Sequence, residues 1–580
     1  MNTLPWLDHL SALYGQETAR AVLAELTARA HKYAPLIAAR PSRAAELTER
    51  DAMLITYGDQ VRQPGVAPLS TLAAFCARHL TGLISCIHLL PFYPYSSDDG
   101  FSVIDYRQVN PALGDWETVK ALGRAFRLMY DGVINHISAH SAWFEAFLQG
   151  QPPYRDYFIT VTGQPDLSQV VRPRTLPLLT RFDTAFGPKA VWTTFSADQI
   201  DLNYANPSVL VEIVDLLLFY VAQGAEFIRL DAIAYLWKEI GTTCIHLPQT
   251  HHVVQLFRAI LAEVAPHVKL ITETNVPHLD NVSYFGDGQN EAHLVYNFAL
   301  PPLVLHTLRT GNARALSGWA GGLKLPSPRT AFFNFLASHD GIGLNPARGI
   351  LTDLEIDTLV QQTLAHGGLI SYKQNPDGVP TPYEMNISYF DALSAPGSAE
   401  PLDRQAGRFM AAQAILLSLA GLPGIYFHSL FGSRGWPEGV ALTGQSRTIN
   451  RQKLDLPSLE QELADPSTLR HTVFSRYAGL LRARAASPAF HPLGSQQALD
   501  YGEAIFALQR VSPQDNEMVL CLQNVTDRPL AAPVRAADLS AKGPVTDLVS
   551  GRQFNWPPEA PLELRPYQTV WLTAAEHFSA

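Results

Sequence analysis

Cysteine is scarce in this chain of 580 residues, which contains four in all. Cys76, Cys86, Cys244 and Cys521 form no CxxC pair, and their spacings match no set of zinc ligands. We expect each of them to be a buried free thiol, because unpaired cysteines usually pack as small apolar side chains. The cysteine pattern therefore argues against a structural zinc site.

Charge and long apolar runs are also limited. Charged residues make up 17% of the chain and the net charge is −10, so there is no basic nucleic-acid footprint. No apolar run approaches the roughly 20 residues of a membrane span, and the start lacks a charged region followed by an apolar one. We expect a soluble, cytoplasmic monomer or homodimer that binds neither nucleic acid nor membrane. Any anion site must be built locally from cationic side chains or backbone N–H groups.

Short apolar segments are present, and most of them alternate with segments of helical periodicity. Strands that alternate with helices predict a parallel sheet with helical crossovers. Eight such units predict an α/β fold, the (β/α)8 TIM barrel. The strand candidates are residues 52–59, 85–92, 128–136, 225–235, 268–276, 292–300, 331–340 and 421–429.

Two strand spacings are irregular, and the two ends of the chain differ from the middle. We expect a helical extension at 1–50 and a catalytic barrel at 51–492. Within the barrel we expect an inserted domain after strand three at about 139–222, and a looped insertion at about 341–420. From Leu493 the apolar period becomes two, which predicts a C-terminal all-β domain, a β-sandwich, at 493–580.

Polar residues gather at the predicted strand ends, where the active site of a TIM barrel lies. Three carboxylates from three strands suit glycosyl transfer, in which one attacks the anomeric carbon and another protonates the leaving oxygen. Arg229 lies two residues before Asp231, so both point to the same side of a strand and the cation can keep the carboxylate ionised. A lone Asp more often caps a helix, but the set as a whole indicates a barrel enzyme that acts on sugars. The strand-end residues are Asp98, Asn135, His136, Arg229, Asp231, Glu273, His339 and Asp340.

Four segments resemble, in order, the signatures of the α-amylase family of retaining glycosidases and transglycosidases, glycoside hydrolase family 13. They are "DGVINH" (131–136), "FIRLDAIAY" (227–235), "ITETN" (271–275) and "LASHD" (336–340). The resemblance implies that Asp231 is the nucleophile, Glu273 the acid/base and Asp340 the transition-state carboxylate.

Longer segments, such as "SSDDGFSVIDYRQVNPALGDW" (96–116) and "RTINRQKLD" (447–455), are similar to the sucrose-phosphorylase-like branch of that family. Within the branch, residues 272–302 and the helical extension most resemble the glucosylglycerate phosphorylases. This implies transfer of an α-glucosyl unit from 2-O-α-glucosylglycerate to inorganic phosphate, giving α-D-glucose 1-phosphate and glycerate. Sucrose or glucosylglycerol phosphorylase, a hydrolytic α-glucosidase, and a non-catalytic barrel remain as alternatives. We expect no cofactor and no metal.

The resemblance also implies a set of residues that bind the glucose unit. Ordinary core packing is the alternative for the two aromatic members, because aromatic side chains are common in cores. The set comprises Asp98, His136, Phe195, Gln199, Arg229, Tyr235, His339 and Arg447.

Four further residues are candidates for the phosphate and acceptor side. Arg174 resembles a phosphate-contacting Arg of the sucrose phosphorylases. A guanidinium suits this role because it binds phosphate in a bidentate manner. Tyr383 belongs to "TPYEMNISY" (381–389), which resembles an acceptor loop of the sucrose phosphorylases, and Glu384 stands where those enzymes carry Gln. A carboxylate there repels an anion unless it pairs with a cation or points away. Arg434 is a candidate for the carboxylate of glycerate, and a solvated loop arginine is the alternative for both Arg174 and Arg434.

Overall fold

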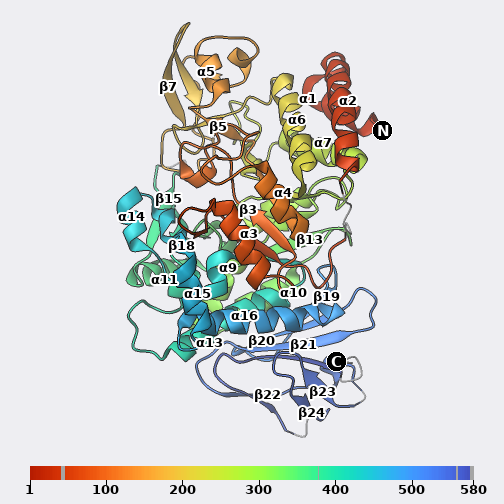
Figure 1. The fold of residues 1–580 in the computed structure, drawn as a ribbon, viewed down its shortest axis with the longest axis vertical. Coiled ribbons are helices and arrows are strands. Elements are labelled where there is room, and N and C mark those ends of the chain that lie inside the picture. The colour runs from red at the N-terminus through yellow and green to blue at the C-terminus, as the bar shows by residue number, and fades with distance from the viewer. Residues whose placement is uncertain (41–45, 376–377, 542, 557–559, 575–580) are drawn as a thin grey trace.

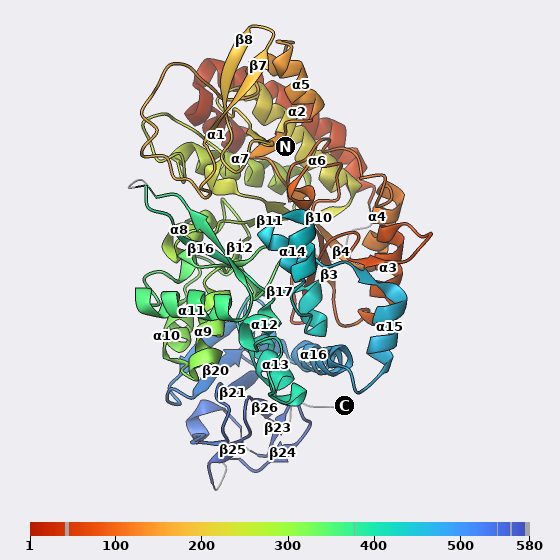
Figure 2. The same cartoon turned by 90° about the vertical axis from the view of Figure 1, so that its left-hand side faces the viewer.

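Eight parallel strands close into a barrel at the centre of the computed structural model (Figures 1 and 2), which describes residues 1–40, 46–375, 378–541, 543–556 and 560–574. Each strand overlaps one of the eight predicted segments, so the predicted barrel is confirmed. The strands follow one another around the barrel in chain order. They are β1 (Met53–Thr56), β3 (Cys86–Leu89), β4 (Arg127–Gly132), β10 (Ala225–Leu230), β11 (Lys269–Thr272), β12 (Leu294–Tyr296), β13 (Ala331–Phe335) and β17 (Leu422–Tyr426).

Helices surround the barrel (Figure 1). The apolar run of α6 (Pro207–Gln223) is almost wholly buried, and the side chain of Asn206 caps its start by accepting from the Ser208 N–H. Gly224, in a left-handed conformation, ends the helix and leads directly into β10. The other helices of the barrel region are α3 (Pro68–His79), α4 (Trp116–Ala125), α7 (Pro248–Val264), α8 (His278–Val282), α9 (Leu300–Thr310), α10 (Arg314–Gly322), α13 (Leu402–Ser418), α14 (Pro437–Thr443), α15 (Leu456–Ala464) and α16 (Leu469–Ala485).

The N-terminal extension forms a helical hairpin of α1 (Leu4–Tyr14) and α2 (Gln16–Ala38). In this hairpin α1 packs on α7 and α2 packs on α6, outside the strands (Figure 1). The hairpin therefore adds a layer beyond the helices of the barrel.

The segment after β4 holds β5 (His136–Ser138), α5 (Ala142–Leu148), β6 (Thr160–Val161), β7 (Leu179–Thr184), β8 (Gly187–Trp192) and β9 (Gln199–Asp201). Strands β6, β8 and β7 form one small sheet, and β5 pairs with β9. These strands end at Asp201. The next helix, α6, is one of the helices around the barrel, although most of it falls within the insertion expected at about 139–222. The β5–β9 pairing sets His136 opposite Asp201.

The segment after β13 holds β14 (Ile342–Gly343), α11 (Asp353–Ala365), β15 (Leu369–Lys373), β16 (Thr381–Asn386) and α12 (Tyr389–Leu393). Strands β14, β16 and β15 form an antiparallel sheet in which Gly343 lies opposite Glu384. An isolated bridge between Arg172 and Gln374 joins this segment to the one after β4. A separate short pair is formed by β2 (Val61–Arg62) and β18 (Leu454–Asp455).

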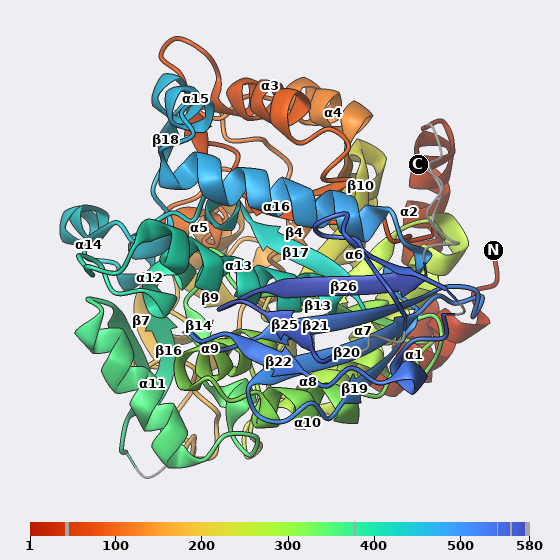
Figure 3. The same cartoon turned by 90° about the horizontal axis from the view of Figure 1, so that it is seen from below.

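The C-terminal part is all β and lies at the opposite end of the molecule from the β7–β8 hairpin (Figures 1 and 2), so it faces the viewer when the molecule is seen from below (Figure 3). Its two sheets share one apolar core, which includes Leu520 and Val570 of the larger sheet and Leu564 of the smaller. The larger sheet contains β19 (Ser495–Leu499), β20 (Ile505–Val511), β21 (Met518–Asn524), β26 (Thr569–Ala574), β23 (Val545–Asp547) and β24 (Gln553–Phe554), and the smaller contains β22 (Leu530–Ala532) and β25 (Leu562–Leu564).

All four cysteines are buried and free, as expected. Over the part of the chain that the structure describes, no helix has the length and apolar character that crossing a membrane requires.

Candidate active site

A pocket of about 710 Å³ lies at the carboxyl ends of the barrel strands. Asp231 follows β10, Glu273 follows β11 and Asp340 lies beyond the end of β13, so three strands bring three carboxylates to one cavity. Most of the residues predicted from the sequence line the same pocket. They are Asp98, His136, Arg174, Phe195, Gln199, Tyr235, His339, Tyr383 and Arg447.

Arg229 is 2% exposed and connects the carboxylates. Its Nη1 donates to Oδ1 of Asp231 at 2.8 Å and also to Asp131, while its Nη2 lies 3.8 Å from Oε2 of Glu273. Nε2 of His88 lies 2.7 Å from Oδ2 of Asp131. Sequence analysis missed the partnership of Asp131 and His88 with Arg229, because these side chains come from neighbouring strands and not from one motif.

Retaining glycosyl transfer requires one ionised carboxylate and one protonated carboxyl group, and Asp231 and Glu273 are the candidates for this pair. Burial raises the pKa of each to about 7, and Arg229 opposes the rise. Neighbouring carboxylates add to it, namely Asp131 and Asp340 for Asp231, and Asp231 and Asp340 for Glu273. Arg229 is closer to Asp231 than to Glu273, so its charge favours an ionised Asp231 and leaves the proton on Glu273. The backbone N–H of Ala232 donates to Oε2 of Glu273 at 3.0 Å and fixes that carboxyl group.

Asp340 has the opposite electrostatic environment. Burial alone would raise its pKa, but Arg447, Arg451 and Arg229 outweigh burial and lower it. Nη1 of Arg447 lies 2.5 Å from Oδ1 of Asp340, and Nε2 of His339 lies 3.4 Å from Oδ2. Asp340 is therefore held as a carboxylate.

Arg451 was missed by sequence analysis as a site residue. Its Nη1 lies 2.8 Å from Asp99 and 3.4 Å from Asp98, and its Nε donates to the backbone oxygen of His339 at 2.9 Å. It stands four residues after Arg447 in "RTINRQKLD", so the segment that predicted one arginine also contained the other. Arg451 thus fixes both Asp98 and the segment that carries Asp340.

The first signature supplies a hydrogen-bonded group at the wall of the pocket. Nε2 of His136 is 2.9 Å from the backbone oxygen of Phe101 and 3.2 Å from Nε2 of Gln199. Behind them, the buried ammonium of Lys238 contacts Asn135 at 2.7 Å and Asp201 at 2.5 Å. Asn135 therefore supports the wall from behind.

Aromatic rings form the remaining wall. Phe195 meets Tyr235 edge to face at 5.5 Å between ring centroids and lies 5.4 Å from His136. The ring of His339 stacks on Phe101 at 4.7 Å. Phe195 and Tyr235 thus line the pocket as well as packing on each other.

Arg174 provides a free cation in the pocket. Its guanidinium lies 5.9 Å from the centre of the Tyr383 ring, and no carboxylate among the described residues pairs with it. Burial raises the pKa of Tyr235 and Tyr383, and Arg174 opposes this rise in both. Both tyrosines line the pocket together with Glu273 and Arg174.

Glu384 does not line the pocket and is fully buried. Its carboxylate accepts two hydrogen bonds from Arg447, from Nε at 2.9 Å and from Nη2 at 2.7 Å. The sequence predicted that Glu384 would repel an anionic ligand unless a cation paired with it. Arg447 is that cation, and it is shared between Glu384 and Asp340.

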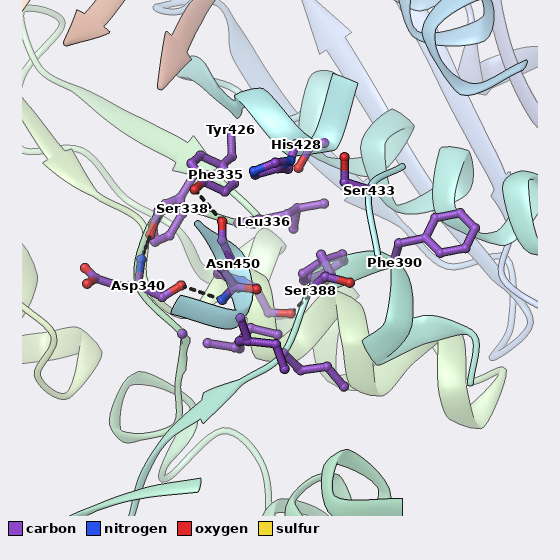
Figure 4. Close-up of a pocket in the computed structure, with 18 of the residues that line it drawn as sticks. Phe335, Leu336, Ser338, Asp340, Ser388, Phe390, Tyr426, His428, Ser433 and Asn450 are labelled. Atoms are coloured by element: carbon purple, nitrogen blue, oxygen red, sulfur yellow. Dashed lines mark hydrogen bonds between the residues drawn. The ribbon is translucent and has the colours of Figure 1, made fainter. Parts of the chain in front are cut away.

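Arg434 lies apart from the catalytic pocket. It lines a neighbouring cavity of about 570 Å³, in which the Asp340 carboxylate points away from Ser388 and Phe390 (Figure 4). Its Nη1 binds Asp391 at 2.6 Å and its Nη2 binds Gln405 at 2.8 Å. The structure does not bring Arg434 together with the other predicted acceptor residues.

Comparison with known proteins identifies the family. Residues 80–317 match the model of the alpha amylase catalytic domain. A glucosylglycerate phosphorylase of Spirochaeta thermophila is 54% identical over 89% of this chain and 88% of that protein. Another from Allomeiothermus silvanus is 50% identical over 98% of both chains. The chain belongs to the α-amylase family.

Within the α-amylase family, this chain is an enzyme of the phosphorylase type. Its fold also matches the crystal structure of sucrose 6F-phosphate phosphorylase from Thermoanaerobacter thermosaccharolyticum, with a TM-score of 0.72 and 24% identity, over 83% of this chain and 96% of that one. Beside the first signature, the Lys238 ammonium lies between Asn135 and Asp201. Across the described ranges, no group of three or more His, Cys, Asp or Glu residues is arranged to hold a metal ion.

Proposed function

We propose that this enzyme transfers an α-glucosyl unit from 2-O-α-glucosylglycerate to inorganic phosphate, giving α-D-glucose 1-phosphate and glycerate. Asp231 attacks the anomeric carbon and forms a β-glucosyl ester, while Glu273 protonates the departing oxygen of glycerate. Phosphate then attacks the anomeric carbon of the ester from the face that glycerate left, and Glu273 accepts a proton from the phosphate. Two inversions give net retention.

The observation that carries this proposal is the unpaired guanidinium of Arg174. Two arginines line the pocket among the described residues, and Arg447 is already bound by Glu384 and Asp340. Arg174 is therefore the cation left for an anionic ligand, and it lies beside the Tyr383 ring. Glycerate and phosphate are both anions, so one guanidinium serves the leaving group in the first step and the attacking group in the second.

An anion site is also what lets phosphate compete with water, which is far more concentrated. Each factor of ten in favour of phosphate requires about 1.4 kcal/mol of preferential binding. A charge-assisted bond between a guanidinium and phosphate contributes energy of this order. The glucosylglycerate phosphorylases named above support glycerate as the carboxylate-bearing half of the substrate.

The test incubates the enzyme with 2-O-α-glucosylglycerate, with and without phosphate. We expect α-glucose 1-phosphate and glycerate in equal amounts, only when phosphate is present, and no detectable glucosyl-protein or product with Asp231→Asn. Free glucose released at the same rate in both conditions would identify a hydrolase and overturn the proposal. In reverse, α-glucose 1-phosphate is offered with glycerate, glycerol, fructose or fructose 6-phosphate, and phosphate release is expected to be fastest with glycerate.

A further inference from the structure

Asn275 lies in the catalytic pocket and has no part in the mechanism above. It follows Glu273 by two residues and lines the pocket together with Arg174, Tyr235 and Tyr383. Its Oδ1 is shielded from solvent and has no hydrogen-bond partner among the described residues. A buried carbonyl oxygen without a donor is unfavourable, and this one belongs to a residue that lines the pocket, where a bound ligand can supply the donor.

Gly343 holds this amide in place. A Cβ atom at position 343 would lie 2.6 Å from Oδ1 and 2.8 Å from Nδ2 of Asn275. The backbone of Gly343 is not in a left-handed conformation, so the position needs glycine for space and not for its dihedral angles. Gly343 lies opposite Glu384 in the β14–β16 pair, so the Asn275 amide packs against this strand pair.

A hydroxyl group is the chemical partner that fits this amide. A hydroxyl both donates and accepts, so it satisfies the amide in either of its two orientations. We propose that Asn275 is a specificity-determining residue that binds the free hydroxyl of the leaving group. Together with the Arg174 guanidinium it selects a hydroxy acid: the cation takes the carboxylate and the amide takes the primary hydroxyl of glycerate.

This inference rests on the proposed function and deepens it, because it names the part of glycerate that the enzyme distinguishes. The two groups also suit phosphate, whose charged oxygens face Arg174 and whose P–OH donates to Oδ1 of Asn275. A purely structural amide, in contrast, would treat acceptors with and without that hydroxyl alike.

The experiment runs the reaction in reverse with α-glucose 1-phosphate and compares glycerate with lactate, which lacks the primary hydroxyl. In the wild type we expect kcat/KM for glycerate to exceed that for lactate by about tenfold to a hundredfold. Asn275→Ala is expected to bring the ratio close to one, by a loss with glycerate, while the value for lactate changes by less than about threefold.

Gly343→Ala provides a second variant that leaves Asn275 in the chain. Its new methyl group displaces the amide, so the glycerate-to-lactate ratio is expected to fall here as well. Gly318→Ala is the matched control, because a Cβ on that helical glycine meets no atom within 4 Å. Its ratio is expected to equal that of the wild type, and thermal unfolding of all variants checks that they are folded.

The outcomes separate the inference from the function on which it rests. If Asn275→Ala slows glycerate and lactate equally, or if the wild type does not distinguish them, the role of Asn275 is wrong while phosphorolysis stands. If the wild type transfers no glucose to glycerate, the proposed function itself fails.

Discussion

At the scale of single residues, one guanidinium decides the roles of two carboxyl groups. Arg229 donates to Asp231 at 2.8 Å but lies 3.8 Å from Glu273. Both carboxyl groups have pKa values raised by burial to about 7, so near neutrality they share one proton. The contact with Arg229 directs the negative charge to Asp231, which supports the proposed roles of Asp231 as the nucleophile and Glu273 as the acid.

Glu273→Gln tests this division of roles. Phosphorolysis of the natural substrate is expected to fall by about 10²–10⁴-fold, because the glycerate oxygen leaves without a proton. With α-glucosyl fluoride, whose leaving group needs no acid, formation of the glucosyl-enzyme is expected to stay near the wild-type rate. Initial rates with the two donors measure the difference, and an equal loss with both would contradict the role of Glu273.

The same assignment fixes the sign of the pH dependence. A group with a raised pKa stays protonated up to about pH 7 and loses its proton above it. Wild-type kcat/KM for 2-O-α-glucosylglycerate should therefore decline as the pH rises through about 7. This alkaline decline should be absent when Glu273→Gln acts on the fluoride donor.

The meeting of Asp231, Glu273 and Asp340 in one pocket could be predicted because each lies in a short motif at a strand end. The pairing of His88 with Asp131 and the contacts of Arg451 could not, since their partners lie far away in the sequence. Asn275 stood within a recognised motif, yet its role depends on an unpaired atom and on its packing against Gly343.

At the scale of elements, the pairing of β14 with β16 positions the negative charge of Glu384 behind the pocket wall. It places Glu384 against Arg447, on the side away from the pocket that Tyr383 lines. The apolar strand segments of the barrel were visible in the sequence, but this two-residue pairing was not, because its register depends on a partner some forty positions away. For the same reason, the sequence predicted that Glu384 would repel an anion but did not show that Arg447 pairs with it.

Glu384→Gln tests the pairing. The amide keeps one acceptor for Arg447, so one bond is lost and the charge of Arg447 is no longer balanced from behind. We expect kcat/KM to fall by about tenfold, as a hydrogen bond between charged groups is weakened. The added positive field favours an ionised Glu273, so the alkaline decline of kcat/KM should move to lower pH.

A control for this variant removes a carboxylate that does not face the site. Asp353 is 93% exposed on α11 and lies 3.4 Å from Arg348. Asp353→Asn is expected to leave both the rate and the pH profile unchanged. A wild-type profile in Glu384→Gln would show that Arg447 does not depend on Glu384.

At the scale of the whole molecule, the barrel could be predicted from eight apolar runs, most of which are separated by amphipathic segments. The sequence also indicated the helical extension, because its apolar residues recur every three to four positions. It could not show where the extension docks. That depends on Asp215 of α6, which lies 3.3 Å from Lys32 and 3.1 Å from the hydroxyl of Tyr33 on α2, and 2.7 Å from Arg107.

Asp215→Ala tests how strongly Asp215 ties both the α2 helix of the hairpin and the loop of Arg107 to α6. Asp215 is buried, whereas Lys32 is 53% exposed and screened by water, so most of the loss comes from Arg107 and Tyr33. We expect destabilisation by about 2 kcal/mol, measured as a lower midpoint of unfolding. Because the network lies outside the catalytic pocket, kcat/KM is expected to stay unchanged. Asp403→Ala, which removes an 82% exposed partner of Arg476, should shift the midpoint far less, and equal midpoints for both variants would show that Asp215 does not anchor the hairpin.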